Sequence, residues 1–153
     1  LALLVEVHEL LASQLKQNHV EWCQLDDIQP YTVLAVYNNL KQVFINLCLN
    51  AMEAMEADHG GRITVGLRAS PDGQRVSVDF HNTGPLIPEE ALPLIFDPFF
   101  TTKGGGTGLG LSISDDIIRQ HQGEILVESA PGRGVTFSVW LPLAPGRQDG
   151  GSS

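Results

Sequence analysis

The sequence predicts an α/β domain in which helices cover one face of a mixed, mostly antiparallel sheet. Apolar residues recur at helical spacing in several segments, and these segments alternate with short runs that are typical of strands. The chain has 153 residues, 42% of them hydrophobic, and it shows no internal repeat. This length and composition are enough for one domain with a core of its own.

Each expected element has a local signal. Asn38 or Asn39 can cap the longest helix. The sequence Ser70-Pro71-Asp72-Gly73 is typical of a hairpin turn, and Ala130-Pro131-Gly132 separates the last two strands. In chain order we expect a helix over residues 5–18, a strand over 20–25, an extended segment over 33–36, a helix from 38 or 39 to 56, strands over 63–69 and 75–81, a short helix over 89–95, a helix over 111–122, and strands over 124–129 and 135–141.

The charge and the cysteine content limit the setting of the chain. A formal net charge of −9 without a basic stripe argues against nucleic acid as a partner, and an anionic ligand would need a cation and local donors. Cys23 and Cys48 fit a reduced, cytoplasmic compartment better than a disulfide framework. No stretch approaches the ~20 apolar residues of a membrane span, so we expect no direct membrane contact. We expect a domain over residues 1–144, excised from a longer protein, and a disordered tail over residues 145–153.

Residues 96–111 form the most informative segment, because an aromatic anchor, one lysine and five glycines lead into an apolar run. Glycine lets the backbone adopt positive φ and approach a ligand closely, so that successive N–H groups can converge on an anion. The helix expected from Leu111 would point its positive N-terminus at the same anion. A flexible linker is the alternative, but a linker has no need of the flanking Phe-Asp-Pro-Phe-Phe and Leu-Gly-Leu. The segment therefore predicts a phosphate-holding flap.

Two common nucleotide motifs do not fit these glycines. A Walker A loop ends in Gly-Lys-Ser/Thr, whereas Gly110 is followed by Leu111 and Ser112. The dinucleotide fingerprint needs G-x-G-x-x-G directly after a strand, but here the spacing is G-x-G-x-G after a proline-containing aromatic loop. Neither motif accounts for the flap.

The longest expected helix carries a narrow polar strip between two apolar faces. Asn46 and Asn50 lie one turn apart in this strip, so their side chains share one face of the helix. A buried amide must be hydrogen-bonded or it is costly. The strip therefore either bonds neighbouring backbone, in a packing role, or lines a cavity, where an amide oxygen and substrate phosphates could complete a Mg²⁺ shell.

Four motifs together resemble the ATP-binding catalytic domain of sensor histidine kinases, in the wider family of gyrase, the MutL ATPases and ATP-dependent heat-shock chaperones. Residues 40–54 are similar to the N box of the family, 96–103 to its F box, 106–111 to its G2 box and 132–137 to its last glycine turn. The resemblance covers about residues 5–142, and four motifs in the right order are more specific than any one of them. It implies a Bergerat-type two-layer α/β sandwich in a cytoplasmic domain, whose parent protein can be membrane-anchored.

The resemblance also implies roles for individual residues. The Mg²⁺ ligand of the family falls on Asn50, Asn46 lies beside it near the phosphates, and Lys103 would approach the β- or γ-phosphate of ATP. Asn46 and Lys103 are therefore the expected catalytic residues, and a lid would span about residues 97–107. The other residues expected to bind ATP are Asn82, Gly84, Ile87, Phe96, Thr102, Gly106, Thr107, Gly108, Leu109, Gly110, Leu111 and Thr136, the last as support for the adenine pocket.

One position separates the kinases of this family from the hydrolases. The ATPases carry a glutamate one helical turn before the metal-binding asparagine, as a general base for water, and this chain has Asn46 there. An amide cannot take a proton, so the resemblance implies transfer to a supplied nucleophile, which in histidine kinases is an imidazole on a separate helical domain. The implied partners are a histidine-bearing dimerisation domain of the same parent protein and a response regulator. We expect the isolated domain to be a monomer.

The sequence departs from the family in the G1 box, where Asp-x-Gly-x-Gly is expected before Ile-Pro. Asn82 replaces the aspartate, which normally accepts a hydrogen bond from the exocyclic amine of adenine, and Leu86 replaces the second glycine. An amide oxygen can still accept one such bond, without charge assistance. Three functions therefore stay open. The domain is a histidine kinase domain, a regulatory or binding module of the same fold that binds nucleotide weakly, or an ATPase. Asn46 argues against the ATPase.

Overall fold

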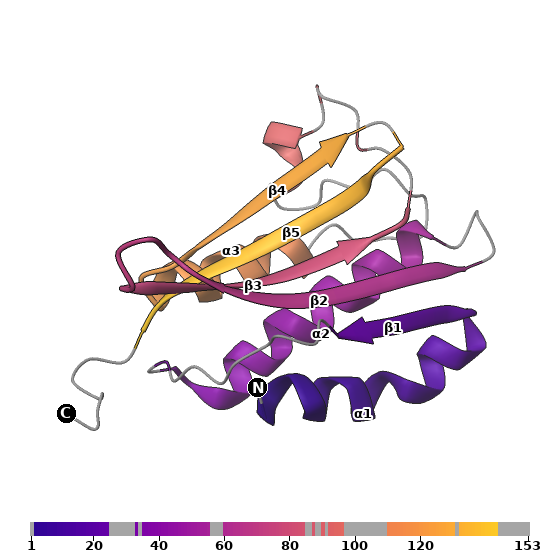
Figure 1. Cartoon of the computed structure of the whole chain (residues 1–153), viewed down its shortest axis with the longest axis horizontal. Coiled ribbons are helices and arrows are strands. Elements are labelled where there is room, and N and C mark those ends of the chain that lie inside the picture. The colour runs from indigo at the N-terminus through magenta and orange to yellow at the C-terminus, as the bar shows by residue number, and fades with distance from the viewer. Residues whose placement is uncertain are drawn as a thin grey trace.

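The computed structural model describes residues 2–24, 33, 35–55, 60–84, 87, 90, 92–96, 110–130 and 132–143. In chain order its elements are α1 (Ala2–Gln17), β1 (Val20–Gln24), α2 (Tyr37–Ala54), β2 (Gly61–Ala69), β3 (Arg75–Asn82), the 3₁₀ helix η2 (Leu92–Leu94), α3 (Gly110–Gln120), β4 (Glu124–Ala130) and β5 (Gly134–Pro142) (Figure 1). This order confirms the α/β prediction. The tail expected over residues 145–153 lies outside the described residues.

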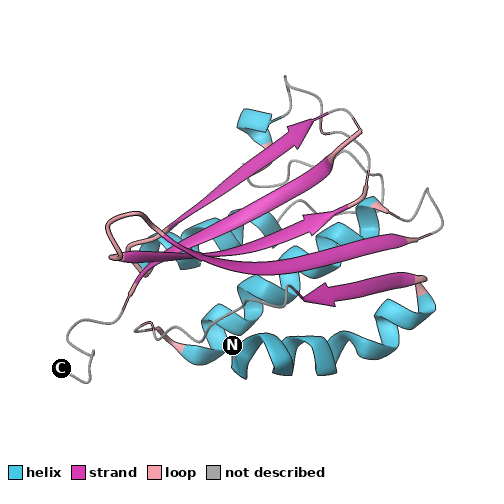
Figure 2. Ribbon diagram, in the orientation of Figure 1, coloured by secondary structure: helices cyan, strands magenta, loops and turns pink. Residues whose placement is uncertain are grey.

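The strands form one five-stranded sheet in the order β1-β2-β3-β5-β4 (Figure 2). β1 pairs with β2 in parallel, and the other neighbouring pairs are antiparallel. The sheet is therefore mixed and mostly antiparallel, as expected from the sequence. Its register sets Asn82, the last residue of β3, opposite Ile63 of β2 and Val135 of β5.

One hydrophobic core lies between the sheet and the helices. In Figure 1 the sheet faces the viewer, α2 and α3 lie behind it, and α1 runs beside β1. Along β3, the buried side chains of Val76, Val78 and Phe80 alternate with polar ones, which is the pattern of a strand with its core on one face. Phe44 of α2 packs on Phe80 with ring centroids 5.3 Å apart. Truncating such an aromatic side chain in a core costs about 3–5 kcal/mol, so this contact helps to fix α2 on the sheet.

The start of α2 differs from the prediction. The helix begins at Tyr37, and its N-cap residue is Val36, which makes no side-chain cap. Neither Asn38 nor Asn39 is therefore the cap. The imidazole of His121, just beyond α3, accepts a hydrogen bond at Nε2 from the Val36 N–H, across 3.0 Å.

Three smaller expectations also change. Leu49, on one of the two apolar faces expected for α2, is 38% exposed, so that face is not fully buried. The described residues of the expected extended segment 33–36 belong to no strand, and among the described residues of 89–95 only the three of η2 are helical. Within the described ranges, no helix combines the length and apolar character that a membrane span requires.

Candidate functional site

The structure describes only part of the site that the sequence predicts. Residues 97–109 lie outside the described chain, and with them Thr102, Lys103 and the glycine-rich residues Gly106, Thr107, Gly108 and Leu109. The expected lid over residues 97–107 falls in the same segment. The predicted residues that the structure does describe are Asn46, Asn50, Asn82, Gly84, Ile87, Phe96, Gly110, Leu111 and Thr136.

The polar strip of α2 is a hydrogen-bonded chain that leads to α3. The side chain of Gln42 donates to Asn46 Oδ1 across 2.8 Å, and Asn46 Nδ2 donates to the hydroxyl of Ser114 across 3.4 Å. Ser114 is fully buried, so Asn46 reaches into the contact between the two helices. Asn50, one turn further along α2, is partly buried on the same side.

Helix α3 places its N-terminus beside this strip. It begins at Gly110, one residue before the predicted start at Leu111, and Ser114 lies one turn further on. The hydrogen bond between Asn46 and Ser114 therefore holds the first turn of α3 close to the middle of α2. Unpaired N–H groups and the positive end of the helix dipole make such an N-terminus a favourable place for an anion.

The end of β3 lies near the C-terminal end of α2. Asn82 is 2% exposed, and its Oδ1 accepts a hydrogen bond from the backbone N–H of Gly84 across 2.8 Å. A Cβ at Gly84 would lie 3.3 Å from Met55 Cγ and 3.5 Å from Ala54 Cβ, the residues that end α2. Asn82 and Gly84 are therefore packed at the same end of the molecule as the later turns of α2.

Glycine at position 134 is required by this packing. Gly134 has φ +76°, and a Cβ there would lie 2.1 Å from the carbonyl oxygen of Asn82. No side chain fits between the start of β5 and the end of β3. The close approach of the two strands thus fixes the backbone that carries Asn82.

Two further predicted residues pack near this end of the sheet. The backbone N–H of Ile87 donates to the Ser129 hydroxyl of β4 across 2.8 Å, and the side chains of Ile87 and Phe96 both pack against the core. Ile87 is therefore attached to β4.

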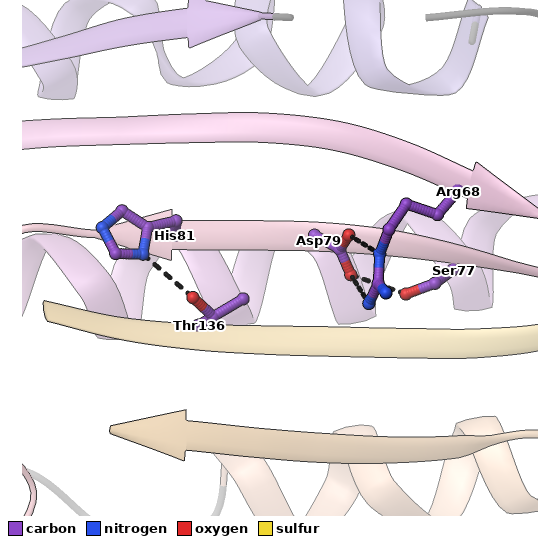
Figure 3. Close-up of polar contacts among 5 residues, drawn as sticks. All are labelled: Arg68, Ser77, Asp79, His81 and Thr136. Atoms are coloured by element: carbon purple, nitrogen blue, oxygen red, sulfur yellow. Dashed lines mark hydrogen bonds and ion pairs between the residues drawn. The ribbon is translucent and has the colours of Figure 1, made fainter. Parts of the chain in front are cut away.

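Among the predicted site residues that the structure describes, Thr136 lies apart from Asn82. It lies on the sheet face opposite to the helices, where its hydroxyl is 2.9 Å from Nδ1 of His81 (Figure 3). Successive residues of a strand point to opposite faces, so its neighbour Val135 is the residue of β5 that faces the core beside Asn82. The structure thus places Thr136 on the other face of the sheet from Asn82, and its expected role in the adenine pocket stays a prediction.

The same face carries a polar cluster that the sequence did not reveal. Arg68 donates to both carboxylate oxygens of Asp79, at 2.6 and 3.2 Å, and the Ser77 hydroxyl donates to Asp79 Oδ1 at 2.6 Å (Figure 3). Burial opposes ionisation of Asp79, but hydrogen bonds from Arg68, Ser77 and Ser138 outweigh it and lower the pKa of this carboxyl. The cluster joins β2 to β3 and lies across the sheet from Asn46 and Asn82.

The donor set of the site fits Mg²⁺ bound together with phosphates. Asn50 offers one hard amide oxygen beside Asn46, and the N-terminus of α3 offers N–H donors to an anion. Mg²⁺ keeps several waters and is commonly held by one or two protein oxygens and the oxygens of a nucleotide. This set can therefore complete the shell of a Mg-nucleotide.

Comparison with known proteins decides the family. Residues 35–145 match the family of histidine kinase-, DNA gyrase B- and HSP90-like ATPases. The chain belongs to this family. It is 44% identical over 119 residues to sporulation kinase E of Bacillus subtilis (strain 168), and 45% identical over 112 residues to the sensor histidine kinase ZraS of Klebsiella oxytoca. These matches cover 78% and 73% of this chain but only 15% and 24% of the two relatives.

Solved structures of the same family share the fold. The catalytic domain of histidine kinase ThkA superposes with a TM-score of 0.81 at 39% identity, covering 94% of both chains. ThkA has also been solved in complex with the response regulator protein TrrA, with a TM-score of 0.78 at 35% identity over 96% of this chain and 41% of that one. The histidine kinase-, gyrase- and HSP90-like ATPase fold is thus shown for this chain, and its similarity to the catalytic domains of sensor kinases is plain.

Proposed function

We propose that this domain binds Mg-ATP and transfers its γ-phosphate to a histidine on a separate domain of a sensor kinase. Membership of the ATPase family and the similarity to ZraS and ThkA support a nucleotide-dependent kinase domain. The chain spans a small part of the length of its relatives, so the acceptor histidine and the response regulator are proposed as partners outside this chain.

One observation carries the proposal most directly. The hydrogen bond from Asn46 to Ser114 joins the polar strip of α2 to the first turn of α3, immediately after the glycine-rich segment. An anion at the N-terminus of α3 would therefore lie near the side chains of Asn46 and Asn50. We propose Asn50 as the protein ligand of a Mg²⁺ ion, which would neutralise phosphate charge when bound.

The same geometry favours transfer over hydrolysis. Asn46 accepts one hydrogen bond from Gln42 and donates another to Ser114, so its amide orients neighbouring groups and cannot remove a proton from water. A neutral imidazole needs no such base, because it is already a nucleophile. Lys103 and the glycines at 106, 108 and 110 are proposed to hold the phosphates.

A phosphotransfer assay tests this proposal. The domain is mixed with Mg-ATP and a helical domain that carries the acceptor histidine of its parent protein. We expect phosphate on the acceptor that is labile in acid and stable in base, and no label when the acceptor histidine is replaced by alanine. Steady release of free phosphate without label on the acceptor would instead assign the chain to the hydrolases. Absence of any nucleotide binding at millimolar concentration would leave a regulatory or binding module as the remaining function of this domain.

A further inference from the structure

We infer that the neutral ring of His121 is a pH-sensitive latch, which ties the end of α3 to the start of α2 and so positions the nucleotide site. The latch is the hydrogen bond between the backbone N–H of Val36 and Nε2 of His121. Its effect on the site rests on the proposed nucleotide-binding function. The latch itself is a property of the nucleotide-free domain.

A first hydrogen bond fixes which ring nitrogen of His121 carries a proton. His121 follows the last residue of α3, and its backbone N–H bonds to the carbonyl of Ile118. The carbonyl of Ile117, four residues before His121, is met by the ring instead, with Nδ1 at 2.7 Å. A carbonyl can only accept, so Nδ1 carries the proton. The ring thus satisfies one of the carbonyls at the end of the helix.

The second hydrogen bond uses the lone pair that this tautomer leaves on Nε2. The backbone N–H of Val36 donates to it across 3.0 Å. Val36 is the N-cap residue of α2 and makes no side-chain cap, so the ring supplies a partner from another part of the chain. Protonation of Nε2 would set two N–H donors against each other. The latch therefore closes only on a neutral ring.

The described surroundings give a protonated ring no ion pair in exchange. The ring borders an open hollow of about 440 Å³, whose described walls carry no charged side chain. The nearest charged residues along the adjoining elements pair elsewhere, at 2.9, 2.8 and 3.2 Å: Lys41 with Glu6, Arg119 with Asp115, and Glu124 with Arg75. Asp116, five residues before His121, lies on a different face of α3. Protonation thus removes a hydrogen bond without a compensating contact.

The latch connects the two helices that carry the proposed site. Val36 meets His121 at one end of the helix pair, and Asn46 meets Ser114 nearer to the N-terminus of α3. From the first contact to the second, the chain runs forward along α2 and backward along α3, so the helices are antiparallel and joined at two points. Opening the latch leaves one of these joints. Asn50, beyond that joint on α2, can then shift relative to the anion site at the start of α3.

NMR spectra of the ring nitrogens and backbone amides of the nucleotide-free domain test the latch. We expect Nδ1 protonated and Nε2 unprotonated at about pH 7.5, and a Val36 amide signal that moves with protonation of the His121 ring as the pH falls to about 5.5. His121→Gln is the matched variant, because its amide oxygen can accept near the position of Nε2 and does not titrate. Its Val36 signal should stay in place. His8→Gln, on α1, is the control and should respond like the wild type.

A Val36 signal that does not follow the ring in the wild-type domain would overturn the latch. So would an equal movement in His121→Gln, because the signal would then report another titrating group.

Calorimetric titration with Mg-ATP at the same two pH values tests the positioning role. We expect the affinity of the wild-type domain to fall by roughly two- to fivefold more than that of His121→Gln, the effect of losing one hydrogen bond. Titration of the nucleotide phosphates is common to both proteins, so the difference belongs to the ring. Affinities that fall in parallel would overturn the positioning role and leave the proposed nucleotide binding intact. Absence of binding to the folded domain at the higher pH would overturn both, while the Val36 signal still decides the latch.

Discussion

Asn46 of α2 donates a hydrogen bond to the buried hydroxyl of Ser114 on α3, and this pair links the two helices beside the start of α3. Oδ1 of the same amide accepts from Gln42 across 2.8 Å. Both ends of the amide are therefore engaged with protein groups. A side chain held in this way can position its neighbours. It cannot act as a general base that removes a proton from water.

The first prediction replaces this amide by a carboxylate. Asn46→Glu should raise steady ATP hydrolysis without an acceptor by about tenfold or more, because a general base contributes 10²- to 10⁴-fold when it is well placed. Phosphate release measures the effect. Asn39→Glu adds the same charge two turns earlier at an exposed position of α2 and should leave hydrolysis at the wild-type rate. An equal rise in both variants would show a general effect of charge and contradict the role given to position 46.

The second prediction compares Gly132, in the turn before β5, with Gly134, the first residue of β5. Gly134→Ala should cost about 3 kcal/mol or more and weaken nucleotide binding, because its Cβ would lie 2.1 Å from the Asn82 carbonyl oxygen at φ +76°. Gly132→Ala has a similar φ of +72° with nothing within 4 Å, so it should cost only about 1 kcal/mol. Urea unfolding of the two variants measures the difference. Equal costs would mean that the contact with Asn82 is unimportant.

The sequence predicts the elements well because their apolar patterns are local. It does not show on which face of the sheet Thr136 lies, since a motif fixes a position along β5 but only strand alternation fixes the face. The buried Val135, Phe137 and Val139 were the available signal for that face. The capping of α2 could not be foreseen, because the His121 ring that binds Val36 is 85 residues away in the chain.

The same distinction applies to the candidate site. The departure at Asn82 is visible in the sequence, but the direction of its amide depends on the backbone N–H of Gly84 in three dimensions. Likewise, the helical spacing of Asn46 and Asn50 marks Asn46 as a candidate site residue. Its hydrogen-bond partner Ser114 lies 68 residues away in the sequence, on another helix. Local patterns locate such residues, and only tertiary contacts reveal what their polar atoms do.

The third prediction concerns the end of α3. Gln122 adopts φ +64°, while the N–H groups of Gln122 and Gly123 bond back to the carbonyls of Arg119 and Ile118, which is a Schellman motif. Gln122→Gly removes the strain of a left-handed residue and should stabilise the domain by about 0.5–1 kcal/mol. Gln120→Gly, at the last residue of α3, should instead destabilise the domain, by up to about 1 kcal/mol. Unfolding midpoints that shift in the same direction for both variants would contradict this account.

The fourth prediction uses the lowered pKa of Asp79. A carboxyl whose pKa is lower in the folded state than its ordinary 3.8 stabilises the fold above that value, and this contribution is lost as the pH falls through the lowered pKa. The unfolding free energy of wild-type protein should therefore fall more steeply than that of Asp79→Asn from about pH 5 to about pH 2. As a control, Glu21→Gln breaks an exposed ion pair with Arg62 and should change the profile far less. Parallel curves for wild type and Asp79→Asn would contradict the prediction.

The most direct test of the central claim, that this domain binds a Mg-nucleotide through Asn50, is calorimetric titration of ATP with and without Mg²⁺. We predict that Mg²⁺ tightens binding to the wild-type domain and to Asn38→Ala, an exposed asparagine of the same helix, by about tenfold or more. Asn50→Ala should retain the weak binding seen without Mg²⁺ and lose the gain. An undiminished gain in Asn50→Ala, or no nucleotide binding by the folded wild-type domain at millimolar concentration, would contradict the account.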